Sequence, residues 1–530
     1  MASIFGLFSK NSANVVGNGV RSNVGGGFRS SDQSYSSHVD RISRSMPKQS
    51  NILTVDTINQ QMLKCRYDVR GEIYLAALKR TQEGKEVIYT NVGNPQALGQ
   101  NPLTFPRQVM SLLLSPFLLD HPQVSQMFPP DAISRAKLYL SHIKGGLGAY
   151  SDSKGNPYIR QEIASFIAAQ TGMPSDPNNI FISNGASECV RMLLFAMIRN
   201  SSDGVMVPIP QYPLYSASIA LYGGELVGYY LDEDNGWSLD IAELERALQA
   251  ARSKGIVVRA FVFINPGNPT GQCLTEDNIR DLITFCYNNR LVLCADEVYQ
   301  ENIYNPSKPF ISARKVLGTM AEPYFSGTEM VSFHTVSKGA YGECGLRGGY
   351  MELHNMDPLV VDELYKIASI NLSPNAPGQV AVGLMVNPPK PGDYSYAQYQ
   401  REKGQVLESL KRRARLMTDA FNALEGVVCQ ETDGAMYCFP RITLPANAIE
   451  AAKQKDKQPD VMYCLELLEE TGISTVPGSG FQQIPGTFHI RTTILPPENK
   501  FAEIIEKFSS FHKGFMRRYG SNYHSVRSKL

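Results

Sequence analysis

The sequence predicts an α/β fold in which a mainly parallel sheet carries helices on both faces. Through the middle of the 530-residue chain, short apolar runs alternate with longer amphipathic segments. Strands separated by helices of this length are typical of a parallel sheet. The predicted strands span residues 180–182, 204–208, 260–264 and 291–295, and the helical patterns span 188–199, 241–251 and 276–288.

The two ends of the chain differ from this middle part. Residues 1–50 hold twelve serines and six basic residues but only two acids. Such a composition is typical of an organelle transit peptide or, equally, of a plain flexible extension. After a Pro-Pro-Lys-Pro-Gly run at 388–392 come a charged helical pattern (396–424), a hairpin-like stretch (427–441) and closing helices. These elements indicate a second, smaller α+β domain.

These patterns divide the chain into parts. A length of 530 residues allows two or three domains of ~100–200 residues each. No internal repeat is visible. We expect a disordered or targeting extension (1–50), an N-terminal arm with part of the small domain (51–103), a large domain (104–387), a small C-terminal domain (388–515) and a tail (516–530).

Composition and charge argue against several classes of function. The net charge is +1, with 19% charged residues, so we expect neither a nucleic-acid surface nor a polybasic membrane face. No apolar run approaches the ~20 residues that span a bilayer. The nine cysteines include no C-x-x-C pair, and the eight histidines follow no zinc-site pattern. We therefore expect reduced thiols and no protein-held metal.

Lys338 stands in the most informative setting of the chain. An apolar, β-branched run at 330–336 leads into Ser337-Lys338-Gly339, and Arg347 follows nine residues after the lysine. The lysine therefore lies on a loop at the end of a strand, where active sites of α/β proteins collect. A lysine there can form a Schiff base with a carbonyl cofactor. Ser-Lys-Gly alone is common, so an ordinary lysine is the alternative.

Two further motifs follow predicted strands. Residues 184–188 (Asn-Gly-Ala-Ser-Glu) open a helix after the strand at 180–182, and free N–H groups there with the Ser187 hydroxyl suit a phosphate. Simple capping by Ser187 is the alternative. Residues 265–271 (Asn-Pro-Gly-Asn-Pro-Thr-Gly) fix a turn that presents Asn268, an uncharged donor. A merely rigid loop is the alternative.

Two charged residues stand within apolar surroundings. Asp296 ends the apolar run at 291–295, and a buried carboxylate needs a cationic or N–H partner. Opposite a pyridine nitrogen it would keep that nitrogen protonated; an acid capping the next segment is the alternative. Arg491 lies on a predicted strand, where its guanidinium suits bidentate binding of a carboxylate. An ordinary ion pair is equally compatible with the local sequence.

The order of these motifs resembles the class I, fold-type I aminotransferases, which depend on pyridoxal 5′-phosphate. Asn-Gly-Ala-Ser, Pro-Gln-Tyr-Pro at 210–213, the 265–271 string, Asp-Glu-Val-Tyr at 296–299, Ser-Lys-Gly and a late strand arginine follow the order of that class. The resemblance runs from about Asp56 to about Met516. Residues 67–72, 91–96 and 476–481 resemble the alanine aminotransferase subfamily. Residues 103–107, 145–155, 331–338 and 473–481 are more similar still to its plant-type glutamate:glyoxylate branch.

The resemblance implies a role for each matching residue. Lys338 would bind the cofactor covalently and move a proton between substrate and cofactor. Asp296 would pair with the ring nitrogen, and Arg491 would bind the substrate carboxylate beneath Gly93. The tyrosine Tyr212 would stack on the ring. The phosphate would be held by Ala186, Ser187, Thr335, Ser337 and Arg347, the phenolate oxygen by Asn268 and Tyr299, and the partner subunit's phosphate by Tyr150 of this chain.

Some positions depart from the family pattern. Ala340 lies where the subfamily usually has an aromatic residue, and Arg347 lies one residue further from Lys338 than in the wider class, which matches the subfamily. No residue is assigned securely to the distal carboxylate of glutamate, and Arg70 is a guess. The role of Tyr150 implies an obligate homodimer with shared active sites.

The resemblance implies amino transfer from L-alanine or L-glutamate to glyoxylate, 2-oxoglutarate or pyruvate. The terminal Ser528-Lys529-Leu530 is a peroxisomal address that an import receptor reads, and photorespiratory glyoxylate is handled in peroxisomes. The extension at 1–50 favours a mitochondrion or dual targeting instead. The alternatives are a mitochondrial alanine:2-oxoglutarate aminotransferase, a lyase of the aminocyclopropane-carboxylate synthase type, and a non-catalytic relative that serves as a regulator.

Overall fold

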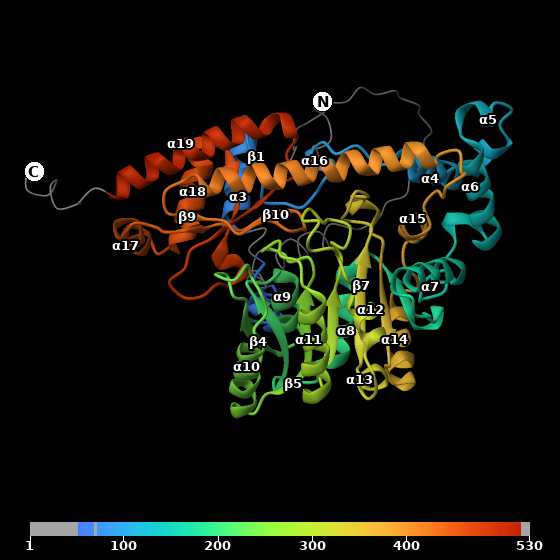
Figure 1. Ribbon diagram of the computed structural model, residues 1–530, viewed down its shortest axis with the longest axis horizontal. Coiled ribbons are helices and arrows are strands. Elements are labelled where there is room, and N and C mark those ends of the chain that lie inside the picture. The colour runs from blue at the N-terminus through green and yellow to red at the C-terminus, as the bar shows by residue number, and fades with distance from the viewer. Residues whose placement is uncertain (1–50, 68–70, 521–530) are drawn as a thin grey trace, which may run out of the picture. The chain divides into compact units, whose positions relative to one another are not determined.

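The central element of the fold is a seven-stranded sheet, drawn in Figure 1. The computed structural model describes residues 51–67 and 71–520. The order of the sheet is β2-β8-β7-β6-β5-β3-β4. Strands β3 to β7 pair in parallel, whereas β8 runs antiparallel to β2 and to β7. The strands are β2 (Ile180–Ser183), β3 (Asp203–Ile209), β4 (Glu225–Tyr230), β5 (Val257–Ile264), β6 (Val292–Asp296), β7 (Met330–Thr335) and β8 (Gly349–His354).

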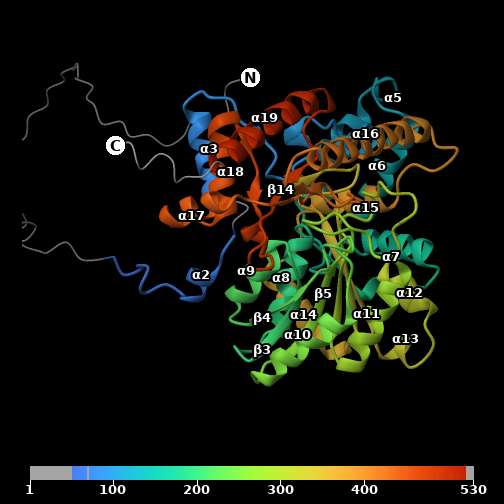
Figure 2. The same ribbon diagram turned by 60° about the vertical axis from the view of Figure 1, so that its left-hand side comes forward.

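Both faces of this sheet are buried, because successive side chains of a strand point to opposite faces. In β5, Phe261 and Phe263 pack into the same apolar cluster as α10 (Ile241–Ser253) and α11 (Glu276–Asn289). Val262 and Ile264 of the same strand pack with α8 (Ala186–Met197), α9 (Pro213–Leu221) and α14 (Pro358–Ile370). The predicted α/β fold, a mainly parallel sheet with helices on both faces, is confirmed (Figures 1 and 2).

Two strands of the sheet were not among the predicted ones, and each has a local reason. The strand β4 lies at the edge of the sheet with one pairing neighbour, and its buried residues alternate with half-buried ones around Gly228. The strand β8 is interrupted in its apolar pattern by Glu352, which is nevertheless buried. Its carboxylate accepts from the Ser175 hydroxyl at 2.6 Å and lies 3.7 Å from the Arg314 guanidinium.

Three small sheets accompany the central one. The strand β1 (Ile88–Tyr89) pairs with β12 (Ile473–Ser474), and β9 (Val427–Val428) pairs with β11 (Arg441–Ile442). The strand β14 (Ile490–Thr493) lies between β10 (Tyr437–Cys438) and β13 (Val476–Pro477).

The stretch at 427–441 is therefore not one simple hairpin. Its ends pair as β9 and β11, but β10 pairs with β14 instead. Backbone hydrogen bonds hold the intervening loop elsewhere, from Gly434 N to Gly271 O (2.8 Å) and from Ala435 N to Asn302 O (3.0 Å).

The expected long helix is α16 (Tyr396–Asn422), and the closing helices are α17 (Ala446–Gln454), α18 (Pro459–Thr471) and α19 (Phe501–Gly520). These four helices share one apolar cluster with the small sheets. The other helices are α2 (Gln61–Lys64), α3 (Glu72–Gln82), α4 (Thr104–Leu114), α5 (Val124–Met127), α6 (Pro130–His142), α7 (Pro157–Thr171), α12 (Ala313–Thr319), α13 (Tyr324–Gly327) and α15 (Ala376–Val386). No helix of the described residues is long and apolar enough to cross a membrane.

Several predictions concern residues outside the described ones. These are the extension at 1–50, Arg70, and Ser528 to Leu530. Residues 51–58 belong to a unit of their own and hold a turn closed by Thr57 N donating to Thr54 O at 3.1 Å. Residues 516–520 of the predicted tail belong to α19. The domain boundaries at 103/104 and 387/388 stay a prediction.

Candidate active site

One cavity of about 440 Å³ gathers twelve of the thirteen predicted site residues. It lies where β5, β6 and β7 end, at the carboxyl edge of the parallel strands where α/β proteins bind ligands. Its volume falls within the range of ~300–1,000 Å³ usual for small-molecule sites. The predicted residues that line it are Gly93, Ala186, Ser187, Tyr212, Asn268, Asp296, Tyr299, Thr335, Ser337, Lys338, Arg347 and Arg491.

Lys338 enters this cavity from the turn that follows β7. Its amine donates to the Gly93 carbonyl at 3.5 Å and lies 5.2 Å from the centre of the Tyr299 ring. Among the described residues, it forms no ion pair within 4 Å. A half-buried amine without a carboxylate partner is available for reaction with a carbonyl group.

Asp296 ends β6 and is 5% exposed, as its place after an apolar run predicts. One carboxylate oxygen accepts from the Tyr215 hydroxyl at 2.7 Å, whereas the other is buried without a hydrogen-bond partner among the described residues. Burial raises the pKa of Asp296 to about 6, against the lowering effect of the Tyr215 hydrogen bond. A buried carboxylate with one oxygen free of hydrogen bonds is suited to bind a cationic partner.

The start of α8 lines part of the cavity. The N-cap residue is Gly185, which has no side chain that could cap the helix. Ser187 lies inside the helix, so capping by Ser187 is not what the structure shows. Its hydroxyl instead accepts from Arg347, which also donates to the Asn184 carbonyl at 2.9 Å. An arginine, a hydroxyl and the N–H groups of a helix start together suit a phosphate.

Two hydroxyl groups at and just after the end of β7 also line the cavity. The Thr335 hydroxyl donates to the Gly348 carbonyl at 2.8 Å and lies 3.2 Å from the Ser337 hydroxyl. Both residues are buried, and both line the cavity.

Asn268 connects two other side chains that line the cavity. Its amide nitrogen donates to the Tyr299 hydroxyl at 3.4 Å, and its carbonyl oxygen accepts from Arg491 at 3.2 Å. The loop that carries it is fixed by Leu274 N donating to the Asn265 side chain at 3.0 Å and by Gly271 N donating to Gly267 O. The loop is rigid, as one reading of its sequence predicts, and it also presents Asn268 to the cavity.

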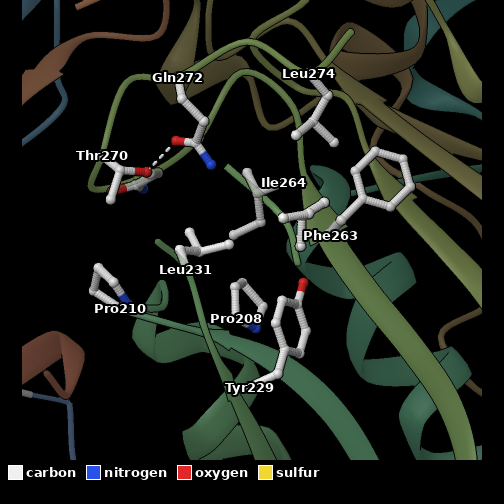
Figure 3. A pocket seen from close by; sticks show the side chains of 12 residues that line it. Pro208, Pro210, Tyr229, Leu231, Phe263, Ile264, Thr270, Gln272 and Leu274 are labelled. Atoms are coloured by element: carbon white, nitrogen blue, oxygen red, sulfur yellow. Dashed lines mark hydrogen bonds between the residues drawn. The ribbon is translucent and has the colours of Figure 1, made fainter. Parts of the chain in front are cut away.

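Figure 3 shows the apolar side chains behind this loop and the hydrogen bond between Thr270 and Gln272. The space among them is about 10 Å³, which is about enough for one water molecule. This second space supports the Asn268 loop rather than offering a ligand site.

Arg491 lies on β14 and is 1% exposed. Its terminal nitrogens donate to Asn268 and to the Asn91 carbonyl, whereas Nε is buried without a partner. Among the described residues it forms no ion pair, so the alternative of an ordinary strand ion pair does not hold there. A buried guanidinium with an unused donor is suited to a carboxylate ligand.

Comparison with known proteins decides the family. A family model described as "Aminotransferase class I and II" matches residues 119–508. The chain belongs to this aminotransferase family. Over 471 residues the aminotransferase is 60% identical to glutamate–glyoxylate aminotransferase 1 of Arabidopsis thaliana, covering 89% of this chain and 98% of that protein. It is 50% identical to alanine aminotransferase 2, mitochondrial, of the same organism, covering 88% of each chain.

A solved structure shares the fold. An aminotransferase from Escherichia coli superimposes with a TM-score of 0.68 at 24% identity, covering 88% of this chain and 99% of that one. The recognition of the chain as an aminotransferase from its motifs is confirmed, and the lyase and non-catalytic alternatives are not supported by these comparisons.

Sequence reasoning did not assign some residues of the aminotransferase's cavity. Tyr67 lies in it, and its hydroxyl is 2.9 Å from that of Tyr212. Tyr437 and Cys344 also line it. Tyr67 stands in a stretch that resembles the subfamily, which offered a signal. Tyr437 offered none, because only the pairing of β10 with the distant β14 brings it here.

Tyr150 is the predicted site residue that this cavity does not include. Its side chain is 79% exposed and borders a different cavity of about 300 Å³, together with Asn156 and Gln379. Its predicted role concerns the partner subunit, so this chain alone does not test it.

Proposed function

We propose that this aminotransferase uses pyridoxal 5′-phosphate to move the amino group of L-glutamate or L-alanine to glyoxylate, 2-oxoglutarate or pyruvate. The observation that carries the proposal is the meeting, in one cavity, of the Lys338 amine, an unpartnered Asp296 oxygen and an unpartnered Arg491 nitrogen. The names of the relatives, which specify glutamate–glyoxylate and alanine aminotransferases, support the choice of substrates.

The residues of the cavity fit this cofactor. Its phosphate suits the start of α8 with Ser187 and Arg347, and its protonated ring nitrogen suits the buried Asp296 oxygen that lacks a partner. Asn268 and Tyr299 would hold the phenolate oxygen, and Tyr212 would cover the ring. When bound, the cofactor supplies an aldehyde that condenses with amines and a ring that withdraws electrons.

The chain's own residues would then bind, orient and move a proton. The amine of Lys338 would bind the cofactor covalently and afterwards act as the base that takes the proton from the substrate's α-carbon. The Arg491 guanidinium would hold the substrate carboxylate and so orient that carbon toward Lys338. Gly93, whose carbonyl accepts from the lysine, would close the cavity over the substrate.

We further propose a homodimer in which Tyr150 reaches the phosphate of the neighbouring site. Exposure of 79% for a large aromatic side chain supports a partner at this position. The activity of mixed dimers, formed from a Lys338→Ala chain and a Tyr150→Ala chain, tests this arrangement.

The proposed location is the peroxisome, since the chain ends in Ser528-Lys529-Leu530. Relatives include an alanine aminotransferase whose name specifies the mitochondrion. A fluorescent protein fused before residue 1 should reach peroxisomes, and one fused after Leu530 should not. Delivery of the fusion after Leu530 to mitochondria, with the fusion before residue 1 left outside peroxisomes, would favour the second candidate, a mitochondrial alanine:2-oxoglutarate aminotransferase.

A matrix of donors and acceptors tests the substrates. Purified protein loaded with cofactor is assayed with alanine or glutamate against glyoxylate, 2-oxoglutarate or pyruvate. We expect turnover with both donors, and a kcat/KM for glyoxylate that is not exceeded by that for 2-oxoglutarate. A tenfold preference for 2-oxoglutarate, about 1.4 kcal/mol, would favour the second candidate. Absence of keto-acid-dependent exchange would exclude both.

A further inference from the structure

Tyr437 occupies the centre of the site, although nothing in its local sequence marks it. It is 2% exposed and lines the cavity from β10. The pairing of β10 with β14 places Tyr437 opposite Thr493, and Arg491 is two residues away on the same strand. Residues in this diagonal relation lie on one face of a sheet, within reach of aromatic and long side chains.

The ring of Tyr437 holds the guanidinium of Arg491. The central carbon of that group lies 4.3 Å from the ring centre of Tyr437 and 4.7 Å from that of Phe481. Attraction between a cation and an aromatic face is strongest when water is excluded. Contacts with two buried rings limit how the planar group can turn, so the rings help to fix where its unused Nε points.

The hydroxyl of Tyr437 contacts Tyr299 and lies close to Gly93. It accepts from the Tyr299 hydroxyl at 3.3 Å. It also fills the space that a Cβ on Gly93 would need, and the amine of Lys338 lies 3.2 Å from that same point. The backbone of Gly93 does not adopt a positive φ. This glycine is therefore required for space, and Tyr437 is a large part of the reason.

The charge around the hydroxyl supports a close relation to the reacting groups. Burial raises the pKa of Tyr437, but the charges of Lys338 and Arg491 and the hydrogen bond from Tyr299 outweigh it and leave the pKa below its usual value. The phenol oxygen is thus stabilised by the two cations that are proposed to bind the cofactor and the substrate.

We propose that Tyr437 is a positioning residue for amino transfer, with two separable parts. Its ring orients Arg491 for the substrate carboxylate, and its hydroxyl fits against Gly93 and sets the position of the 92–94 loop over Lys338. The inference rests on the proposed function of Arg491 and Lys338, and it extends that function to a residue and a matched pair that the family motifs do not include.

Two variants of the cofactor-loaded enzyme separate the role of the Tyr437 ring from that of its hydroxyl. Tyr437→Leu removes the ring, and we expect KM to rise tenfold or more for alanine, glutamate and glyoxylate alike, with a smaller change in kcat. Tyr437→Phe keeps the ring, so KM should stay within about threefold of the unchanged enzyme. Equal KM values for the Leu variant and the unchanged enzyme would overturn the role of the ring.

The role of the hydroxyl is tested by a double-mutant cycle. Gly93→Ala should lower kcat/KM by about a hundredfold, because the new methyl group overlaps the Tyr437 hydroxyl and approaches Lys338. Adding Tyr437→Phe removes that oxygen, and we expect at least a tenfold recovery. Independent, multiplicative effects of the two substitutions would overturn the pairing of the Tyr437 hydroxyl with Gly93.

A binding measurement keeps the inference apart from the proposed function. Oxamate, an unreactive analogue of a small keto acid, is titrated calorimetrically into each variant. We expect the unchanged enzyme and Tyr437→Phe to bind it equally and Tyr437→Leu to bind it at least tenfold more weakly. An unchanged enzyme that fails to transfer amino groups refutes the proposed function. Equal oxamate affinity in all three proteins refutes the inference about the ring. Far-UV circular dichroism confirms that each variant is folded.

Discussion

At the residue scale, Lys338 and Asp296 are surrounded in opposite ways. The amine of Lys338 faces the cavity without an ion pair among the described residues, whereas Asp296 is buried with one oxygen bonded to Tyr215 and one without a partner. A buried, half-satisfied carboxylate costs free energy in the unbound protein. We interpret this cost as the consequence of a position kept for a cationic ligand.

The first prediction concerns Lys338. Lys338→Ala should abolish steady-state transamination, because no other described residue of the cavity supplies an amine. The phosphate and ring contacts remain, so the cofactor should still bind without a covalent bond. Borohydride reduction followed by peptide mapping measures the covalent link. The matched control is Lys366→Ala on the surface, whose side chain is 69% exposed and which should keep full activity. A reducible adduct and turnover in the Lys338 variant would identify a different lysine.

The second prediction follows from the pKa of Asp296, which burial raises from 3.8 to about 6. The raised value means that the folded, cofactor-free protein binds a proton more readily than the unfolded chain. The contribution of this group to stability is therefore lost as pH rises from about 4 through about 6. Above that range the ionised carboxylate costs about 3 kcal/mol, at ~1.4 kcal/mol per pKa unit.

Asp296→Asn should consequently stabilise the cofactor-free protein at pH 8, with a benefit that disappears near pH 4. The same variant should bind the cofactor more weakly and lose activity, since its neutral amide no longer pairs with a protonated ring nitrogen. Urea unfolding at several pH values measures the first effect, and spectrophotometric titration measures the second. A stability difference that does not vary between pH 4 and pH 8 would contradict the assignment.

At the element scale, the start of α8 depends on a close fit between a glycine and an arginine. Gly185 has φ +89°, and a Cβ there would overlap the terminal nitrogen of Arg347. Gly172, at the end of α7, has φ +75° but has nothing within 4 Å of an added Cβ. The two glycines therefore share a positive φ, and they differ in ψ (152° at Gly185, 6° at Gly172) and in what surrounds them.

A pair of alanine variants tests this element. Gly172→Ala should lose about 1–2 kcal/mol of unfolding free energy, because it places a side chain in the left-handed region. Gly185→Ala should lose about 1–3 kcal/mol, because its φ of +89° and ψ of 152° are essentially restricted to glycine. Only Gly185→Ala should also weaken cofactor binding, by tenfold or more, since it displaces Arg347 from Ser187. Equal cofactor affinity in the two variants would mean that the start of α8 does not hold the phosphate.

Some strands and site residues could be predicted from the sequence, and others could not. Strands β3, β5 and β6 contain continuous apolar stretches, because both faces of these strands are buried, and such stretches are visible in a sequence. The edge strand β4 and the strand β8, with its buried Glu352, lack that pattern. Asp296 and Arg491 were recognisable because each is a charge in apolar surroundings, and Lys338 because it follows a predicted strand directly. Tyr437 was not, since its place depends on a pairing between strands more than fifty residues apart.

At the scale of the whole molecule, the proposed dimer connects Tyr150 of one chain with the cavity of the other. If so, a dimer of one Lys338→Ala chain and one Tyr150→Ala chain has one damaged site with both changes and one site with neither. Coexpression with two different affinity tags isolates this mixed dimer. We expect about half of the unchanged activity. Activity no greater than that of the Tyr150→Ala homodimer would show that Tyr150 serves its own chain or none.

The cavity around Lys338 is proposed to carry an amino group from glutamate to glyoxylate. The most direct test of this transfer is a single-turnover experiment with ¹⁵N-glutamate, performed on cofactor-loaded protein in the absence of other amino donors. After removal of free glutamate, glyoxylate is added and the products are analysed by mass spectrometry. We expect one equivalent of ¹⁵N-glycine per active site from the unchanged enzyme and none from Lys338→Ala. No labelled glycine from the unchanged enzyme, or equal amounts from both proteins, would contradict it.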